Sequence, residues 1–230
     1  MQVIGLLGGM SWESTAEYYR LINEEVRRRL GRQHSASILM YSVDFEAVER
    51  LQDAGDWDEA GQLLAADAQR LERGGAGFVV LCTNTMHKVA PAIEAAVNIP
   101  LIHIADAAAE AIKRAGIASV GLLGTRFTME ENFYRGRLFE KHGLEVLVPD
   151  ANARTQVDRV IYDELCQGKV LEESRRVYVG IIEVLAERGA EAVILGCTEI
   201  GLLIKQQDSP LPVFDTTYIH AGRAVDIALS

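Results

Sequence analysis

The sequence has few cysteines and prolines, and it has no long apolar run. Only 3 cysteines and 5 prolines occur among its 230 residues. An odd, small number of thiols does not build a disulfide framework, so we expect a reduced, cytoplasmic protein. No segment approaches the roughly 18 consecutive apolar residues of a membrane helix, and residues 1–8 lack the basic start of a signal peptide. A disulfide-rich secreted protein and a membrane-spanning protein are therefore not expected.

Spacings typical of metal and nucleotide sites are also missing. The histidines and cysteines form neither C-x-x-C nor H-E-x-x-H, so no metal is expected. The segment 8–11, Gly-Gly-Met-Ser, matches neither G-x-G-x-x-G nor G-x-x-x-x-G-K. The formal net charge of −10 argues against nucleic acid and anionic membranes as partners. A small anionic ligand stays compatible, because helix N-termini bind anions whatever the net charge.

What the chain does contain is an internal repeat with a period of ~115 residues, half its length. Three segments recur in the same order at nearly constant offset: 5–8 (GLLG) as 121–124, 71–85 as 185–199, and 99–102 as 211–214. A duplicated α/β half explains this order better than chance does. The gapless match of the second pair aligns Cys82 with Gly196 and Thr83 with Cys197.

Short apolar runs alternate with longer helical patterns in both halves. We expect strands at about 3–7, 37–42, 78–81, 101–104, 119–123, 145–148, 192–195 and 212–214. Capping spacings predict helix starts at Ser14-x-x-Glu17, Asp56-x-x-Glu59 and Thr128-x-x-Glu131. The predicted fold class is α/β, with two pseudo-symmetric, doubly wound domains that have parallel sheets, and the active site in the cleft between them.

Ligands of such sheets bind where strands end, so the residues after the third strand of each half are the candidates. Thr83 and Cys197 occupy that place, and a thiol at a helix N-terminus ionises more easily than a free one. Two halves that face each other present one reactive group on each side of a small acid. This arrangement suits inversion of a carbon centre by a base on one face and an acid on the other, without a pyridoxal-type cofactor.

Several of these side chains have a plainer interpretation as packing residues. A single Cys after an apolar strand is often a small buried hydrophobe. Because adjacent residues of a strand point to opposite sides, we expect Cys82 to point into the packing and Thr83 into the cleft, with Cys82 as the alternative partner of Cys197. Cys166 is expected in helical packing, and His87 and His103 are interpreted as helix-start or core polar residues.

Four segments make the sequence resemble the aspartate/glutamate racemase family, and the resemblance runs along the whole chain. They are residues 5–15 (GLLGGMSWEST), 84–87 (NTMH), 196–199 (GCTE) and 214–216 (FDT). The family's first catalytic Cys usually precedes the Asn-Thr pair directly, and here that position holds Thr83. The chain is similar to a subgroup of L-aspartate/glutamate-specific racemases that pair Thr with Cys.

The resemblance implies cofactor-independent racemisation of an acidic amino acid, with Thr83 and Cys197 as catalytic residues. It implies substrate binding by Met10, Asn84, Thr85 and Thr198. Gln52, which follows the second expected strand, is a further candidate for substrate binding and is equally interpretable as a solvated helix or loop residue. It implies a homodimer, and a last segment that packs on the first domain, so the expected domains are 1–100 plus 211–230, and 101–210. Relatives often carry Lys in the region of Cys166, which leaves Arg50 or Arg126 as candidates for the distal carboxylate.

Two other functions remain open on the sequence. Another enzyme of the superfamily, such as a hydantoin racemase, a maleate isomerase or a decarboxylase, shares the two strand-end positions. A non-catalytic protein that binds an acidic ligand fits the missing first Cys. The segments around Met10 and Asn84 favour the amino-acid racemase, and the retained Cys197 disfavours the non-catalytic protein.

Overall fold

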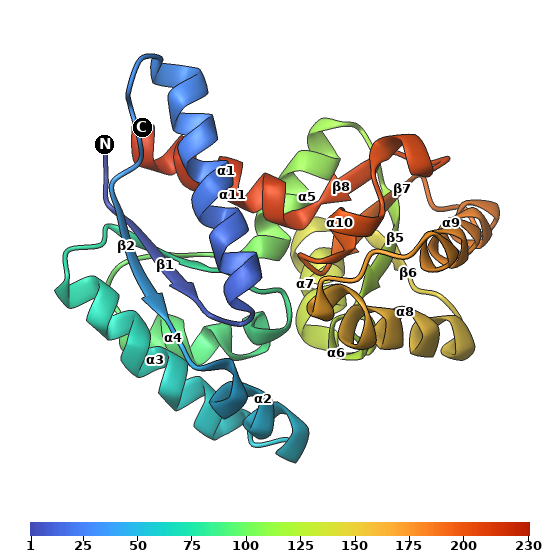
Figure 1. Ribbon diagram of the computed structural model, residues 1–230, viewed down its shortest axis with the longest axis horizontal. Coiled ribbons are helices and arrows are strands. Elements are labelled where there is room, and N and C mark those ends of the chain that lie inside the picture. The colour runs from blue at the N-terminus through green and yellow to red at the C-terminus, as the bar shows by residue number, and fades with distance from the viewer. The chain divides into compact units, whose positions relative to one another are not determined.

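The computed structural model describes residues 1–230, and the chain divides into two compact units (Figure 1). The first unit comprises Met1–Ile104 and His220–Ser230, and the second comprises Ala105–Ile219. Each unit contains one four-stranded sheet whose paired strands all run parallel. The predicted α/β class with two similar parallel-sheet halves is confirmed. None of the helices has the length and apolar character that a membrane crossing requires.

The strand order of the first unit is β2-β1-β3-β4. Its strands are β1 (Ile4–Gly8), β2 (Ile38–Ser42), β3 (Phe78–Leu81) and β4 (Leu101–Ile102). Its helices are α1 (Trp12–Leu30), α2 (Phe45–Ala54), α3 (Trp57–Arg73), the 3-10 helix η1 (Thr85–Val89), α4 (Ala90–Ala96) and most of α11 (Thr216–Leu229).

The second unit repeats this topology with the order β6-β5-β7-β8. Its strands are β5 (Ser119–Gly124), β6 (Glu145–Leu147), β7 (Ala192–Gly196) and β8 (Val213–Asp215). Its helices are α5 (Ile104–Arg114), α6 (Arg126–Glu130), α7 (Asn132–His142), α8 (Ala151–Asp163), η2 (Leu165–Gln167), α9 (Glu172–Glu187), α10 (Ile200–Leu203) and η3 (Gln206–Asp208).

The observed unit boundaries differ from the predicted 1–100 plus 211–230 and 101–210. Residues 101–104 belong to the first unit, because β4 pairs with β3. Residues 211–219 belong to the second unit, because β8 pairs with β7. Only the part of α11 from His220 onward returns to the first unit. The fourth strand of each sheet thus stays with its own repeat, and the returning segment is helical.

Alternation along the strands divides the core of the first unit into two layers. Leu7, Val79 and Leu81 pack with α3 residues such as Leu64 and Ala68. The residues between them pack in a second cluster with α1 and α11, whose members include Leu6, Val80, Cys82, Tyr18, Ile22 and Val225. Each fully buried Leu or Ile of these layers contributes about 1.5–3 kcal/mol to stability. The second unit packs α8 and α9 side chains on β5 and β7 in the same manner.

Helix starts lie one turn earlier than two of the capping spacings indicated. Ser11, not Ser14, is the N-cap of α1, and its side chain accepts from the Ser14 N–H. Thr125, not Thr128, is the N-cap of α6 and accepts from the Thr128 N–H. Asp56 is the N-cap of α3, as predicted, although its side chain makes no capping hydrogen bond. In the first two cases the hydroxyl of the predicted cap lies inside the first turn.

Steric constraints explain the last glycine of the repeated GLLG segment. A Cβ on Gly8 would overlap the side chain of Thr15, at the start of α1. A Cβ on Gly124 would lie 3.1 Å from Thr128 Cβ and 2.9 Å from the carbonyl oxygen of Gly196. Glycine at these two positions therefore lets the following helix start close against the strand end, which brings polar groups to the carboxyl edge of each sheet.

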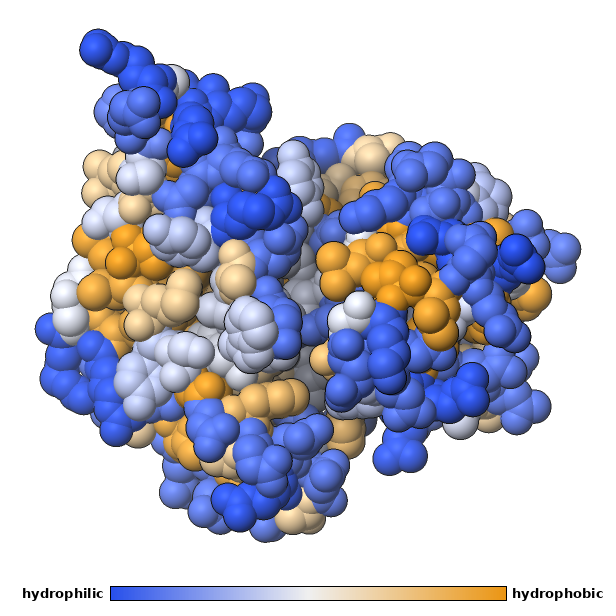
Figure 2. Space-filling model, viewed as in Figure 1, coloured by the Kyte–Doolittle hydropathy of each residue, from blue (hydrophilic) through white to orange (hydrophobic).

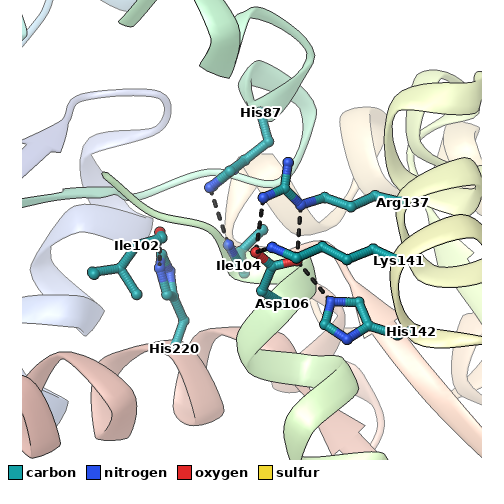
Figure 3. Close-up of polar contacts among 8 residues, drawn as sticks. All are labelled: His87, Ile102, Ile104, Asp106, Arg137, Lys141, His142 and His220. Carbon is teal, nitrogen blue, oxygen red and sulfur yellow. Dashed lines mark hydrogen bonds and ion pairs between the residues drawn. The ribbon is translucent and has the colours of Figure 1, made fainter. Parts of the chain in front are cut away.

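In the second unit, a charge cluster ties α5 to α7 (Figure 3). Arg137 donates two hydrogen bonds to Asp106, of 2.8 and 2.7 Å. Lys141 and His142 lie 2.7 and 2.8 Å from the same carboxylate. Although burial opposes it, these partners hold the pKa of Asp106 far below its usual range.

The visible surface of both units is largely hydrophilic, with scattered apolar areas (Figure 2).

Candidate active site

The chain leaves the first sheet immediately after β3, at Cys82 and Thr83. The Cys82 N–H still donates to the Leu7 carbonyl of β1, at 2.9 Å, whereas the Thr83 N–H turns back to the Leu81 carbonyl, at 2.9 Å. The Cys82 side chain is fully buried in the layer that faces α1 and α11. Burial raises the pKa of its thiol far above the ordinary value. The prediction that Cys82 belongs to the packing is confirmed, and its thiol is kept protonated.

Thr83 begins a run of buried polar residues that leads into η1. Thr83, Asn84, Thr85 and His87 expose between 2% and 8% of their surface. Asn84 is the N-cap of η1, and its carbonyl accepts from the His87 N–H at 3.1 Å. Four polar residues this close together are costly to bury unless they are hydrogen-bonded or meet a polar ligand. The segment predicted from the NTMH motif is therefore a concentrated polar site at the edge of an apolar core.

Met10 and Gln52 reach the same edge of the first sheet from other elements. Met10 follows β1, exposes 5% of its surface and packs with Leu81 and Met86 in one cluster. Gln52, on α2, exposes 6%, and its Nε2 donates to the Met86 Sδ at 2.8 Å. The interpretation of Gln52 as a solvated residue is wrong. Met10 and Gln52 thus both lie against Met86 of η1.

The second unit places Cys197 and Thr198 directly after β7. The partly buried Cys197 Sγ–H donates to Glu199 Oε2 at 2.9 Å. The Thr198 hydroxyl donates to the same oxygen at 2.6 Å. Glu199 itself is buried, with 7% of its surface exposed. One carboxylate oxygen of Glu199 therefore accepts hydrogen bonds from both predicted site residues of this unit.

The expectation that Cys197 ionises easily is wrong in the free protein. Burial, the negative charge of Glu199 and the hydrogen bond to Glu199 raise the pKa of the thiol well above its usual value. The helix that follows, α10, has only four residues, so its dipole is small. A carboxylate within hydrogen-bond distance outweighs it. Cys197 is a protonated thiol whose proton points at a carboxylate.

Cys166 lies beside this site rather than in a helix interior. It is part of η2 and is half-buried. It packs on the same apolar cluster as Cys197 and contributes to the raised pKa of that thiol. Arg50 and Arg126, the candidates for a distal carboxylate, are both exposed. No group of three or more His, Cys, Asp or Glu residues in the chain is placed to hold a metal ion.

Two polar residues at these strand ends were not predicted as site residues. Glu199 is part of the quoted GCTE motif, and the signal was an acid two residues after the candidate thiol. His87 was interpreted as a helix-start or core residue, yet its Nδ1 lies 2.7 Å from the Thr83 carbonyl oxygen. Both are hydrogen-bonded to, or adjacent to, the predicted reactive residues.

Comparison with known proteins defines the class of this molecule. The family model described as Asp/Glu/Hydantoin racemase matches residues 7–224. The chain belongs to this family, and the prediction that it is an isomerase of the racemase type is confirmed. The alternative of a non-catalytic binding protein is set aside.

Individual relatives match along the whole chain. A structure titled a putative Asp/Glu racemase from Yersinia pestis is 56% identical, with a TM-score of 0.95 and 100% of both chains covered. An aspartate racemase homologue from Pyrococcus horikoshii OT3 is 35% identical, with a TM-score of 0.88 and 100% of both chains covered. The broad specificity amino-acid racemase RacX of Bacillus subtilis is 23% identical over 99% of each chain.

Proposed function

We propose that this protein interconverts the enantiomers of aspartate or glutamate without a cofactor. The observation that carries the proposal is the hydrogen bond between the Cys197 thiol and Glu199, 2.9 Å long, at the carboxyl end of β7. A thiol paired with a carboxylate gives up its proton to that carboxylate and becomes a base, and it takes the proton back to become an acid. The family of the chain supports this use of the pair.

In the proposed reaction, Cys197 serves one face of the substrate's α-carbon. The thiol proton passes to Glu199 Oε2, and the thiolate then removes the α-proton, which leaves a planar carbanion. Backbone N–H groups and the short polar side chains of Asn84, Thr85 and Thr198 hold the substrate's α-carboxylate, which makes the α-proton more acidic. Met10 and Gln52 complete the substrate contacts.

Thr83 serves the opposite face in this proposal. The register of the two sheets supports its equivalence to Cys197. Leu81 of β3 pairs with β1 as Leu195 of β7 pairs with β5, and each reactive residue follows its leucine by two positions. A hydroxyl is a far weaker acid than a thiol, so Thr83 donates or relays a proton slowly. Exchange of the α-proton with solvent is therefore faster for the enantiomer whose α-proton faces Cys197.

Proton NMR in D₂O tests the proposal. L- and D-aspartate and L- and D-glutamate are incubated with the protein and no added cofactor. Loss of the α-proton signal, faster for one enantiomer of a pair, is the expected result. Binding of the amino acids without exchange would contradict the proposed reaction.

A wider substrate range is a second candidate. Cys166 packs beside Cys197 and carries no charge that would select an acidic side chain. The relative from Bacillus subtilis is described as a broad specificity amino-acid racemase. Exchange of the α-protons of neutral amino acids at rates similar to those of aspartate would favour this candidate.

We also propose a homodimer in the cytoplasm. The resemblance to the racemase family, in which homodimers are common, supports the dimer. The three free thiols support a reducing compartment. Light scattering of the purified protein measures the mass, and a monomer at micromolar concentration would contradict the dimer.

A further inference from the structure

His87 lies between the candidate residue Thr83 and the start of α5. Figure 3 shows its contact with Ile104. Its imidazole is buried, with 2% of the residue exposed. Nδ1 lies 2.7 Å from the Thr83 carbonyl oxygen, and Nε2 lies 3.2 Å from the Ile104 backbone nitrogen. The His87 N–H bonds instead to the Asn84 carbonyl, so the side chain, not the main chain of His87, reaches the carbonyl of Thr83.

These two contacts determine the proton positions on the ring. A carbonyl oxygen only accepts, so Nδ1 carries the hydrogen that is donated to Thr83. A backbone N–H only donates, so Nε2 carries no hydrogen and accepts from Ile104. The ring is therefore neutral, in the Nδ1–H tautomer. Protonation of Nε2 would replace an attractive contact with two opposed N–H groups.

A second histidine holds the same segment from the other side. His220 Nε2 donates to the Ile102 carbonyl at 2.7 Å, and its Nδ1 accepts from the Tyr18 hydroxyl at 2.8 Å. Burial lowers the pKa of His220 to about 4, so this ring is also neutral. Residues 102 and 104 are thus anchored by two imidazoles of opposite tautomer, which gives His87 a fixed support.

We propose that His87 is a positioning residue for Thr83. It ties the Thr83 carbonyl to the anchored segment at Ile104 and so sets the backbone of the turn after β3, which decides where the Thr83 hydroxyl points. The inference rests on the proposed role of Thr83 in racemisation. A misplacement of about 1 Å at a reacting group lowers its rate by up to ~10²-fold, so the alignment of one backbone carbonyl matters for catalysis.

Three variants separate the two hydrogen bonds of the ring. His87→Phe keeps a ring of similar size and loses both bonds. His87→Asn places an amide N–H near the former Nδ1 and retains the bond to Thr83. His87→Gln places an amide oxygen near the former Nε2 and retains the bond from Ile104. The Asn and Gln variants are matched controls, because each keeps one polar contact and leaves one empty.

The decisive measurement is the ratio of α-proton exchange rates of the two enantiomers in D₂O, with the maximal exchange rate and the half-saturating concentration determined separately for each enantiomer. We expect His87→Phe and His87→Gln to lower the maximal α-proton exchange rate of the enantiomer served by Thr83 by about tenfold or more, with the Cys197-dependent exchange of the other enantiomer nearly unchanged. His87→Asn should restore the ratio. An unchanged ratio in all three variants, or equal losses for both enantiomers, would mean that His87 only fills space.

Two spectroscopic measurements keep the inference testable without activity. Nitrogen-15 NMR of the native protein should show His87 as the neutral Nδ1–H tautomer, and an Nε2–H signal would overturn the proposal. The ¹³C shift of the Thr83 methyl group should move in His87→Gln and return in His87→Asn, and this comparison decides the matter if His87→Phe does not fold. If the native protein does not catalyse α-proton exchange in either enantiomer, the proposed function is wrong. The NMR shifts still test whether His87 positions Thr83.

Discussion

The carboxyl ends of β3 and β7 occupy equivalent places in two sheets of the same topology, yet their chemistry differs. After β3, Thr83 is a neutral hydroxyl in a buried polar run, braced by the neutral ring of His87. After β7, Cys197 is a thiol in contact with a carboxylate. In the proposed mechanism, the two halves share the position of the reactive residue but differ in its acid–base strength. A fold of two similar halves therefore does not imply a reaction of two similar steps.

Removing the thiol tests the comparison most severely. Cys197→Ala should lower α-proton exchange of aspartate and glutamate by at least ~10³-fold, because no other group at this strand end gives and takes a proton as readily. Proton NMR in D₂O measures the rate. Cys82→Ala is the matched control, since that thiol lies in the core, and it should leave the rate within about threefold. Full activity of Cys197→Ala would end the proposed mechanism.

Removing the carboxylate of Glu199 separates the chemical reactivity of the Cys197 thiol from its role in catalysis. Glu199→Gln keeps the shape of the side chain and removes its negative charge, one of the causes of the raised pKa of Cys197. We expect kcat to fall by ~10²-fold because the proton acceptor is lost. Alkylation of Cys197 by iodoacetamide should become faster at pH 8, because its pKa falls. If both rates fall together, Glu199 is a structural residue and not a proton acceptor.

Stability should also fall at both extremes of pH, through different groups. His220 has its pKa lowered to about 4 in the folded protein, so the unfolded chain binds more protons below the ordinary value of about 6.5. The free energy of unfolding should therefore fall by about 1.6 kcal/mol between pH 6.5 and pH 5, a factor of ~15 in the folding equilibrium. On the alkaline side, the raised pKa values of Cys82 and Cys197 predict lower stability above about pH 8.5, where the unfolded thiols ionise.

Urea unfolding at several pH values measures both slopes. The variants His220→Gln and Cys197→Ala serve as controls for the acid and the alkaline side, respectively. Each should reduce only its own slope, and the part of the alkaline slope that remains in Cys197→Ala is expected from Cys82. An acid slope that survives in His220→Gln would assign the effect to other histidines.

Restoring the missing thiol has the smallest expected effect. Thr83→Cys should speed exchange of the slow enantiomer by about tenfold, because a thiol is a stronger acid than a hydroxyl. Thr83→Ser, which keeps a hydroxyl, is the control and should not speed that enantiomer. No gain in Thr83→Cys would argue against Thr83 as the partner of Cys197.

The architecture was readable from the sequence because it depends on apolar runs and on the repeat. All eight strands lie within about two residues of their expected positions. The caps of α1 and α6 were misplaced by one turn, because Ser11 and Thr125 offer the same hydroxyl one turn before the predicted Ser14 and Thr128. The predicted unit boundaries differ from those observed because the repeat does not indicate whether the chain passes to the other unit before or after the last strand of each sheet.

The site was partly readable as well. The strand-end position of Cys197 follows from its distance to an apolar run, but its protonation state does not. That state depends on the Glu199 side chain turning back toward the thiol, which is a matter of rotamer and burial. The bond between His87 and Ile104 joins residues 17 positions apart, and no local pattern encodes it.

The burial of Cys82 changes how cysteines of related sequences are to be counted. A thiol stands one residue from the position where a second reactive group would lie, but it fills the apolar layer beneath α1 and α11. The substitution of Cys82 by Ala or Val would therefore alter packing and not the number of proton-transfer groups. When catalytic cysteines are counted in related sequences, the face of the strand on which each cysteine lies should be considered. Adjacent residues of a strand point to opposite sides, so one can be buried in the core while its neighbour lies in the site.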